Sequence, residues 1–325
     1  MTRRSTRRAL LRSAFGATIG VTPVGTATHA HARASPPPFA YPIRDLGRAP
    51  GDGFLIEVGY ACENARDFPG WWHTGENWHR LAGETGGAEV VAAAAGEVVF
   101  AGYDYPGPVV LLRHGPDLYT QYGHLDYALD VAVGDRVGCG QRLGTVLARS
   151  DKPSHLHFEV RTFFQTATVN GDAPAHGVNC GYDCPPGPGY WPMNAPEHPS
   201  DLGWRNPTNA IARRAFAGGV PSGAEVVVAE GVAGEIPLWS APADTADAEP
   251  AGAMAARAGD RYPLLAVDAG DEAARGTGAE ATRLWYQLHV GLDAIWAQAA
   301  VPSAEFVGTD GQPAAVRLVL LPVVG

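Results

Sequence analysis

Two histidines stand two residues apart in the run 154–160, SHLHFEV, which alternates polar and apolar residues as a β-strand does. One face of such a strand would carry Leu156, Phe158 and Val160, and the other would carry His155, His157 and Glu159. Imidazole exchanges a proton near pH 7, so two rings aimed at one point could perform acid–base chemistry. Taken alone, the pair fits two surface histidines on an edge strand equally well.

Two further histidines lie in short motifs of similar character. His73 belongs to the strand-like run 72–77, and His124 belongs to the run 122–125, YGHL. Glycine-punctuated, β-like sequence separates these runs from each other and from the His155 pair. Four histidines in three short motifs therefore indicate one site that is assembled from several strands.

Composition bounds the fold and excludes one class of partner. A chain of 325 residues can form two domains, and 46% hydrophobic with 18% charged residues is ordinary for a folded protein. The 41 glycines and 27 prolines favour short strands and turns over long helices. A net charge of -10 argues against a nucleic-acid partner, because phosphate binding requires a basic face.

Residues 1–34 are expected to be an export signal. The run 5–12, STRRALLR, resembles the twin-arginine motif, a weakly apolar segment follows, and Ala32-Arg33-Ala34 suits signal cleavage. The apolar part is too short and too polar for a transmembrane span. Residues 35–50 lack periodicity and are predicted to be a tether.

The chain has four cysteines, and an even number is compatible with disulfides in a protein outside the cytoplasm. Cys180 and Cys184 could close a small loop, which leaves Cys62 and Cys139 as a candidate long-range pair. A structural zinc site is a weaker alternative, since no second C-x-x-C accompanies them.

Residues 51–212 are predicted to be β-rich. Four runs are expected to form strands in two pairs, with turns at 105–107 and 138–140: residues 90–101, 109–114, 133–137 and 141–146. The VGDRV…GQRLGTV pattern in the second pair recurs in biotinyl and lipoyl carriers. Those carriers need a lysine at the hairpin tip, and Gly138-Cys139-Gly140 has none, so a carrier function is excluded.

The three histidine motifs together resemble those of the lysostaphin-type (LytM-type) zinc metallopeptidases. The order and spacing agree closely over residues 72–161 and loosely to about 211. The resemblance implies an antiparallel β-sandwich of the lysostaphin, or duplicated-hybrid-motif, type. It also implies a Zn²⁺ cofactor held by His73, the residue at position 77, and His157, with His124 and His155 as catalytic residues beside the zinc-bound water. Three protein ligands would leave the fourth position of zinc open to that water.

Asn77 departs from the family, which has an aspartate at this position. An amide oxygen is neutral and a poorer zinc donor than a carboxylate. Three outcomes are open: Asn77 binds zinc weakly in a working enzyme, His79 takes its place, or zinc is lost and a non-catalytic binding module remains. The presence of all four histidines favours the enzyme.

Other polar and aromatic residues are weaker candidates. Glu76 is expected at the surface, and Glu159 is expected either to support a ligating histidine or to be solvated. A turn role is expected for His114 and a loop position for His176 and His198. The aromatic residues that could line a cleft or pack in the core are Trp71, Trp72, Tyr190 and Trp191.

A second β-rich segment is predicted from 225 to 310, after a linker at 213–224, and residues 311–325 are predicted to be a strand or a tail. Strands are expected at 226–228, 262–267, 284–288 and 294–297. The Trp-Tyr-x-Leu strand and the Ile-Trp-Ala strand resemble the end of bacterial SH3-like domains, which implies a small β-barrel that holds an enzyme on its polymer.

The sequence therefore predicts an exported, mainly β protein located outside the cell or in its envelope. Its first domain, 51–212, resembles a zinc endopeptidase that cuts peptide stems or cross-bridges of peptidoglycan. The alternative is a metal-free cell-wall-binding or regulatory module on the same fold.

Overall fold

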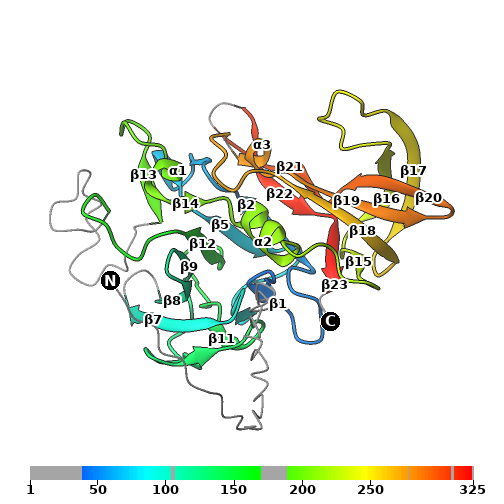
Figure 1. The fold of residues 1–325 in the computed structure, drawn as a ribbon. Helices are drawn as coiled ribbons and strands as arrows, with labels where there is room; N and C mark the ends of the chain where they lie inside the picture. Colours follow the sequence, from blue (N-terminus) through cyan, green and yellow to red (C-terminus); the bar gives the residue numbers. More distant parts are fainter. Residues whose placement is uncertain (1–38, 104–106, 170–188, 277, 309–310, 324–325) are drawn as a thin grey trace, which may run out of the picture. The chain divides into compact units, whose positions relative to one another are not determined.

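The computed structural model describes residues 39–103, 107–169, 189–276, 278–308 and 311–323. In this part of the chain the structure is mostly β, and all paired strands are antiparallel, as the sequence predicted. The strands form four sheets (Figure 1). No helix of these residues is long and apolar enough to cross a membrane.

The largest sheet has ten strands, in the spatial order β10-β7-β8-β9-β12-β5-β2-β22-β21, with β14 beside β12. In chain order these strands are β2 (Phe54–Val58), β5 (Glu76–Arg80), β7 (Gly96–Tyr103), β8 (Pro108–Gly115), β9 (Leu118–Gly123), β10 (Arg136–Val137), β12 (Leu156–Arg161), β14 (Trp204–Arg205), β21 (Ala300–Val307) and β22 (Pro313–Leu318).

The other sheets are smaller. Two three-stranded sheets consist of β1 (Ile43–Arg44), β6 (Glu89–Val91) and β11 (Arg142–Thr145), and of β3 (Glu63–Asn64), β4 (Phe68–His73) and β13 (Tyr190–Pro192). A seven-stranded sheet consists of β15 (Glu225–Val228), β16 (Ala233–Trp239), β17 (Pro250–Arg257), β18 (Arg261–Ala269), β19 (Leu284–Val290), β20 (Asp293–Gln298) and β23 (Leu320–Val323). The helices are α1 (Pro199–Leu202), α2 (Pro207–Ala215) and α3 (Gly278–Ala281).

Strand β12 has the alternation that the sequence predicted, but it is buried on both faces. The apolar face, with Leu156, Phe158 and Val160, lies in the main hydrophobic core. The polar face is covered as well, so Glu159 and Arg161 are fully buried. A second apolar cluster, which includes Trp191 and Trp204, supplies part of this cover. The polar face of β12 is therefore an interior site and not a surface.

The strand pairs predicted between 90 and 146 are only partly correct. β7 and β8 pair as expected, on either side of the predicted turn, although residues 104–106 lie outside the described part. The second predicted pair is wrong, because β10 pairs with β7 and β11 pairs with β6. Residues 138–140 therefore cross between two sheets and do not close a hairpin.

The C-terminal strands join the same sheet as the histidine motifs. β22 pairs with β2 through Ile56 and Val316, and β21 continues the sheet beyond it (Figure 1). Buried residues from before the predicted linker at 213–224 and from after it belong to one hydrophobic core. The contacts make Ser35–Gly325 one compact unit. The four strands expected after 225 are present, in β15, β18, β19 and β20. In the described residues the seven-stranded sheet does not close into a barrel, so an SH3-like domain is not confirmed.

The segment predicted as a tether is packed where the structure describes it. Phe39, Tyr41 and Ile43 are buried in the main core, and β1 pairs with β6. The tether prediction is therefore wrong for residues 39–44. The three apolar side chains have no strand or helix periodicity, which is why the sequence pattern did not reveal their burial.

Buried amides connect α2 to the segment that precedes β19. Asn206 caps α2 by accepting from the backbone of Asn209, and its Nδ2 donates to the carbonyl oxygen of Ala281 at 3.2 Å. Asn209 Nδ2 donates to the same carbonyl oxygen at 2.8 Å. Both amides are fully buried, so these hydrogen bonds fix α2 to the segment before β19, which belongs to the seven-stranded sheet.

The shared core predicts that a cavity in the last strand destabilises the whole unit. Leu320 is fully buried in β23, so Leu320→Ala should lower the free energy of unfolding by about 2–5 kcal/mol. Leu292 is 96% exposed, and Leu292→Ala should change it by less than about 0.5 kcal/mol. Urea unfolding followed by circular dichroism measures both, with one transition expected. Two separate transitions, with only one shifted by Leu320→Ala, would contradict the shared core.

Candidate active site

Strand β12 carries the site, between β9 and β5. The register places His157 opposite Asn77 on β5 and opposite Gly123 on β9. Leu156 lies opposite Trp78, so the next position along brings His155 beside His79, with ring centroids 5.0 Å apart. Because residues two apart share a face of the sheet, these pairs lie in two neighbouring rows on one face.

His73 reaches the same face from a different sheet. It is the last residue of β4, and Thr74 and Gly75 turn the chain into β5. A Cβ at position 75 would lie 2.2 Å from the carbonyl oxygen of Phe158, so this close approach requires glycine. The single strand predicted for 72–77 is therefore wrong. The turn is what lets His73 and Asn77 converge.

Three lone pairs point into the space between His73, His157 and Asn77. His73 Nδ1 donates to the carbonyl oxygen of Gly59 at 3.2 Å, so its Nε2 keeps a lone pair. His157 Nε2 donates to Glu159 Oε1 at 2.9 Å, so its Nδ1 keeps a lone pair. His73 Nε2 and His157 Nδ1 are 3.0 Å apart, and Asn77 Oδ1 lies 3.2 Å from the same Nδ1. Such an arrangement is repulsive unless a proton or a cation lies between the three atoms.

Burial keeps the first histidine neutral. His73 is fully buried, and this burial, together with the neighbouring His157, lowers the pKa of His73 to about 3. A neutral imidazole has the free lone pair that a metal ligand requires. His73 is therefore in the protonation state of a metal ligand at neutral pH.

Glu159 fixes the orientation of His157 from behind. Besides the bond from His157, its carboxylate accepts from Thr74 Oγ1 at 2.8 Å and from Trp204 Nε1 at 2.9 Å. Burial raises the pKa of Glu159, but Arg161 and His157 outweigh this and lower it. The carboxylate is fully buried and ionised, so the solvated role considered for it is wrong, and it supports His157.

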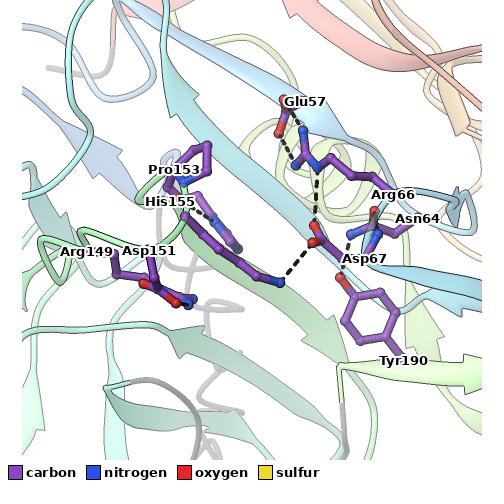
Figure 2. Close-up of polar contacts among 10 residues, drawn as sticks. Glu57, Asn64, Arg66, Asp67, Arg149, Asp151, Pro153, His155 and Tyr190 are labelled. Atoms are coloured by element: carbon purple, nitrogen blue, oxygen red, sulfur yellow. Dashed lines mark hydrogen bonds and ion pairs between the residues drawn. The ribbon is translucent and has the colours of Figure 1, made fainter.

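His124 and His155 stand beside the three converging atoms. Their ring centroids are 4.6 Å apart, and the ring of His124 is 6.4 Å from that of His157. His155 Nδ1 donates to the carbonyl oxygen of Pro153 at 3.3 Å, which leaves its Nε2 as an acceptor (Figure 2). Burial, followed by the neighbouring His124 and His79, lowers the pKa of His155 well below its usual value.

The backbone of His124 is strained. Its φ is 62°, in the left-handed region that residues other than glycine rarely adopt. Strain of this kind persists only where the surrounding structure imposes it, and it is concentrated at functional sites. The four histidines of the three motifs are thus brought together, two at the converging lone pairs and two beside them.

His79, the alternative ligand, lies away from the three converging atoms. Its Nε2 is 3.0 Å from Glu57 Oε2, and its ring stacks on His155. The sequence analysis did not identify Glu57 as a site residue. Its position as the one charged residue in the apolar strand FLIEV could have indicated a functional role. Burial raises the pKa of Glu57, but the neighbouring His79 and Arg66 outweigh this and lower it to about 2.

Glu76 is fully buried, so the surface role predicted for it is wrong. The backbone N–H and the hydroxyl of Thr208, in α2, donate to its Oε1 at 3.0 and 2.7 Å. Burial raises the pKa of Glu76 to about 7, although Thr208 partly offsets the effect. Glu76 does face away from Asn77, as the alternation predicted, but that face of β5 is covered by α2 and is not exposed.

Tyr190 closes the site from β13. Its ring centroid lies 5.2 Å from that of His73, and Asn64 Nδ2 donates to its hydroxyl at 2.9 Å (Figure 2). Burial raises the pKa of Tyr190 to about 12, with hydrogen bonds from Asn64 and Asn77 opposing the rise. The hydroxyl is therefore protonated at neutral pH. Of the other predicted cleft aromatics, Trp191 is buried in the second apolar cluster, while Trp71 and Trp72 are half-buried.

His114 and His198, which are outside the three motifs, have structural contacts. His114 Nδ1 lies 2.8 Å from the carbonyl oxygen of Ala95, and its Nε2 lies 2.7 Å from Thr120 Oγ1. His198 caps α1 by accepting from the backbone N–H of Ser200. His176 lies outside the described residues.

The predicted pairing of Cys62 with Cys139 is wrong. The Cys62 thiol donates to the carbonyl oxygen of Ala314, and the Cys139 thiol donates to that of Ala93, so the two lie in different places. Cys180 and Cys184 lie outside the described residues. The sequence contained no signal that could locate the thiols, because cysteine spacing does not determine connectivity.

Among the described residues, no group of three or more histidine, cysteine, aspartate or glutamate side chains is placed to hold a metal ion. The converging set consists of two imidazoles and an amide, which is a different donor set. Its two nitrogens and one oxygen are of the types that bind zinc, with the amide as the weakest donor. The residues therefore fit a zinc ion, and Asn77 limits the strength of binding.

Residues 73–171 match the profile of Peptidase family M23. Three solved structures are similar to part of the chain. A zinc-containing peptidase from Vibrio cholerae is 27% identical over 38% of this chain and 36% of that chain, with a TM-score of 0.27. The catalytic domain of the antimicrobial peptidase lysostaphin from Staphylococcus simulans is 26% identical over 32% of this chain and 77% of that domain, with a TM-score of 0.27. A chain of the SpoIIQ–SpoIIIAH pore-forming complex is 25% identical over 39% of this chain and 85% of that chain, with a TM-score of 0.31. No curated protein matches the chain.

The low pKa of Glu57 predicts a pH-dependent contribution to stability. The folded-state pKa of about 2 lies below the ordinary value of 4.5, so the folded state binds fewer protons than the unfolded state. Glu57 therefore stabilises the fold fully above about pH 4.5, and this contribution disappears as the pH falls toward 2. Glu57→Gln should be destabilising at pH 7 and should approach the parent protein at pH 3, as measured by urea unfolding at pH 7, 5 and 3. The exposed Glu305→Gln is the matched control, and a Glu57→Gln deficit that is independent of pH would refute the assignment.

Proposed function

We propose that the chain is a zinc-dependent endopeptidase that hydrolyses peptide bonds in bacterial peptidoglycan. The observation that carries this proposal is the convergence of His73 Nε2, His157 Nδ1 and Asn77 Oδ1 within a segment that matches Peptidase family M23. A structural role would have given these polar atoms donors to accept from. Their lone pairs are instead directed at one another.

His73, Asn77 and His157 would hold the ion. A zinc ion in this position supplies Lewis acidity, because it lowers the pKa of water that it binds toward about 7 and polarises a carbonyl group. Glu159 accepts the proton on Nε2 of His157 at 2.9 Å, which fixes the tautomer and the ring orientation so that Nδ1 would face the ion. Gly59 has the same orienting role for His73.

His124 and His155 would handle the proton of the attacking water. His155 donates from Nδ1 to Pro153, so its free Nε2 can accept that proton and later pass it to the leaving amine. His124, 4.6 Å from His155 between ring centroids, would hydrogen-bond the carbonyl oxygen on which negative charge develops. Water adds to the carbonyl carbon, the C–N bond breaks, and a carboxylic acid and an amine leave the site.

The substrate class follows from the family match and from the composition. Peptidase family M23 and a negative chain with 34 acidic against 24 basic residues together favour a peptide polymer over a nucleic acid. Peptide stems or cross-bridges of peptidoglycan are the proposed substrate, which places the protein outside the cell or in its envelope. The twin-arginine-type signal at 1–34 supports export, and the segment 225–310 would hold the enzyme on the wall.

A second candidate function is a metal-free module that binds cell-wall peptides without cutting them. Asn77 is the observation that favours it, because the loss of the carboxylate removes a negative charge from the donor set. The retention of four correctly grouped histidines favours the enzyme, since a binding surface requires none of their specific ring orientations.

Asn77 provides the test of the zinc site. Asn77→Asp should tighten zinc binding by about tenfold or more, because a charged oxygen attracts the cation more strongly than a neutral one. Competition with a chromophoric chelator at pH 7 measures the affinity. Asn194→Asp, at an exposed asparagine, is the matched control and should leave it unchanged.

Zinc content and digestion of peptidoglycan separate the two functions. The enzyme requires about one equivalent of bound zinc together with cleavage in the parent protein. Zinc that appears only in Asn77→Asp, with no cleavage by the parent protein, would instead identify the binding module.

Alanine variants should distinguish the two proposed catalytic histidines, which act on the proton and the carbonyl oxygen, from the proposed metal ligands. His124→Ala and His155→Ala should each lower kcat by about 10²- to 10⁴-fold while they retain zinc, because they contribute proton transfer and charge stabilisation only. His157→Ala should lose both zinc and activity. His289 is exposed, and His289→Ala should retain both. Loss of zinc from His155→Ala would show that the roles are wrongly divided.

A further inference from the structure

A second row of side chains crosses the sheet beside the proposed zinc ligands. It runs from His124, after β9, through His155, before β12, and His79, on β5, to Glu57, on β2. Neighbouring rings lie 4.6 and 5.0 Å apart between centroids, and the last contact, His79 Nε2 to Glu57 Oε2, is 3.0 Å. These strands are neighbours in the order β9-β12-β5-β2, so the sheet itself aligns the row.

A β-bulge aims Glu57 at this row. Leu55 and Ile56 lie opposite His79 and Trp78, but the next pair is Val58 with Asn77, so Glu57 is an extra residue on β2. Arg66 donates to both carboxylate oxygens of Glu57 at 3.2 Å. The carboxylate is thus fixed from one side by a guanidinium and contacts the imidazole of His79 on the other.

A chain of ion pairs connects the same carboxylate to the loop that carries His155. Arg66 Nε donates to Asp67 Oδ2 at 3.3 Å, and Lys152 Nζ donates to Asp67 Oδ1 at 2.9 Å. Figure 2 shows Glu57, Arg66 and Asp67 linked in this way, with His155 and Pro153 on the facing loop. The backbone from Lys152 to His155 closes a circuit, because His155 contacts His79, and His79 contacts Glu57, where the chain of ion pairs begins.

We propose that His79, held by Glu57, is a positioning residue for His155. The ring of His79 stacks on His155 with an interplanar angle of 28°, while His124 meets the same ring edge-on at 78°. Together with the bond from His155 Nδ1 to Pro153, these contacts fix the plane of the ring and the direction of Nε2. The kinetic consequence depends on the proposed peptidase function, whereas the orientation of the ring does not.

The geometry separates this role from core packing and from metal binding. His79 keeps 13% of its side-chain surface exposed, and its Nε2 lies 3.0 Å from Glu57 Oε2. This close contact is a charge contact and does not have the geometry of a hydrogen bond. A ring that served only to fill space would need neither the carboxylate nor the bulge. The side chain acts on His155 through its face, so an aromatic ring without nitrogen should preserve part of the effect.

Imidazole ¹⁵N chemical shifts of the metal-free full chain test the orientation directly. At one fixed pH the parent protein should show His155 as a single tautomer, protonated at Nδ1. His79→Ala should shift His155 toward a mixture of tautomers, His79→Phe should retain the single tautomer, and His289→Ala is the control. His79→Gln keeps a polar contact without a ring, and it should behave as His79→Ala does if the alanine variant does not fold. A His155 spectrum that is unchanged in His79→Ala, or in His79→Gln, overturns the proposal.

Kinetics of the zinc-loaded protein on peptidoglycan give the second measurement. His79→Ala should lower kcat by about tenfold with little change in KM, because a misdirected ring impairs proton transfer and not substrate binding. His79→Phe should recover most of this loss, and His79→Ala with Glu57→Gln should be no slower than His79→Ala alone. If the parent protein shows no cleavage, the peptidase function fails and the ¹⁵N shifts still decide the positioning role. An active parent with an equally active His79→Ala variant overturns the positioning role alone.

Discussion

The antiparallel register of β5 against β12 is the constraint on which the site depends. It places Asn77 opposite His157 and leaves His79 beside His155, so two rows of functional side chains share one face of the sheet. A slip of one residue would turn all of these side chains to the apolar face. The register is protected because Leu156 and Phe158, on the other side of β12, are fully buried in the main core.

The polar face of β12 is buried because two other segments, the end of β4 with its turn and β14, pack against it. β4 brings His73 across, the turn at Gly75 permits the close approach, and Trp204 reaches Glu159 from β14. The carboxylate of Glu159, behind His157, accepts hydrogen bonds from three side chains, those of His157, Thr74 and Trp204, whereas three lone pairs meet in front of His157. Low dielectric strengthens these contacts and makes an uncompensated lone pair costly, so the same burial that stabilises the network favours a cation at that point.

Much of the site could be predicted from the sequence because histidine spacing on a strand carries geometric information. The alternation of SHLHFEV placed His155 and His157 on one face, and the three motifs indicated one assembly. Glu76 was assigned to the surface incorrectly because α2, which is more than 130 residues later in the chain, covers the face of β5 that carries it. The β-bulge at Glu57 and the pairing of β22 with β2 leave no local pattern, since both depend on residues distant in the sequence. Burial of residues 39–43 was missed for the same reason.

X-ray absorption at the zinc K-edge, on protein reconstituted with one equivalent of zinc, tests the central claim most directly. Two imidazole nitrogens and an amide oxygen from His73, His157 and Asn77 should give a first shell of nitrogen and oxygen atoms at about 2.0–2.2 Å, with the outer-shell scattering of two imidazoles. His73→Ala should bind much less than one equivalent of zinc, as expected for His157→Ala, and any zinc that remains bound should show at most half of the imidazole scattering. A spectrum that fits one imidazole or none, or one that is unchanged in His73→Ala, would contradict the account.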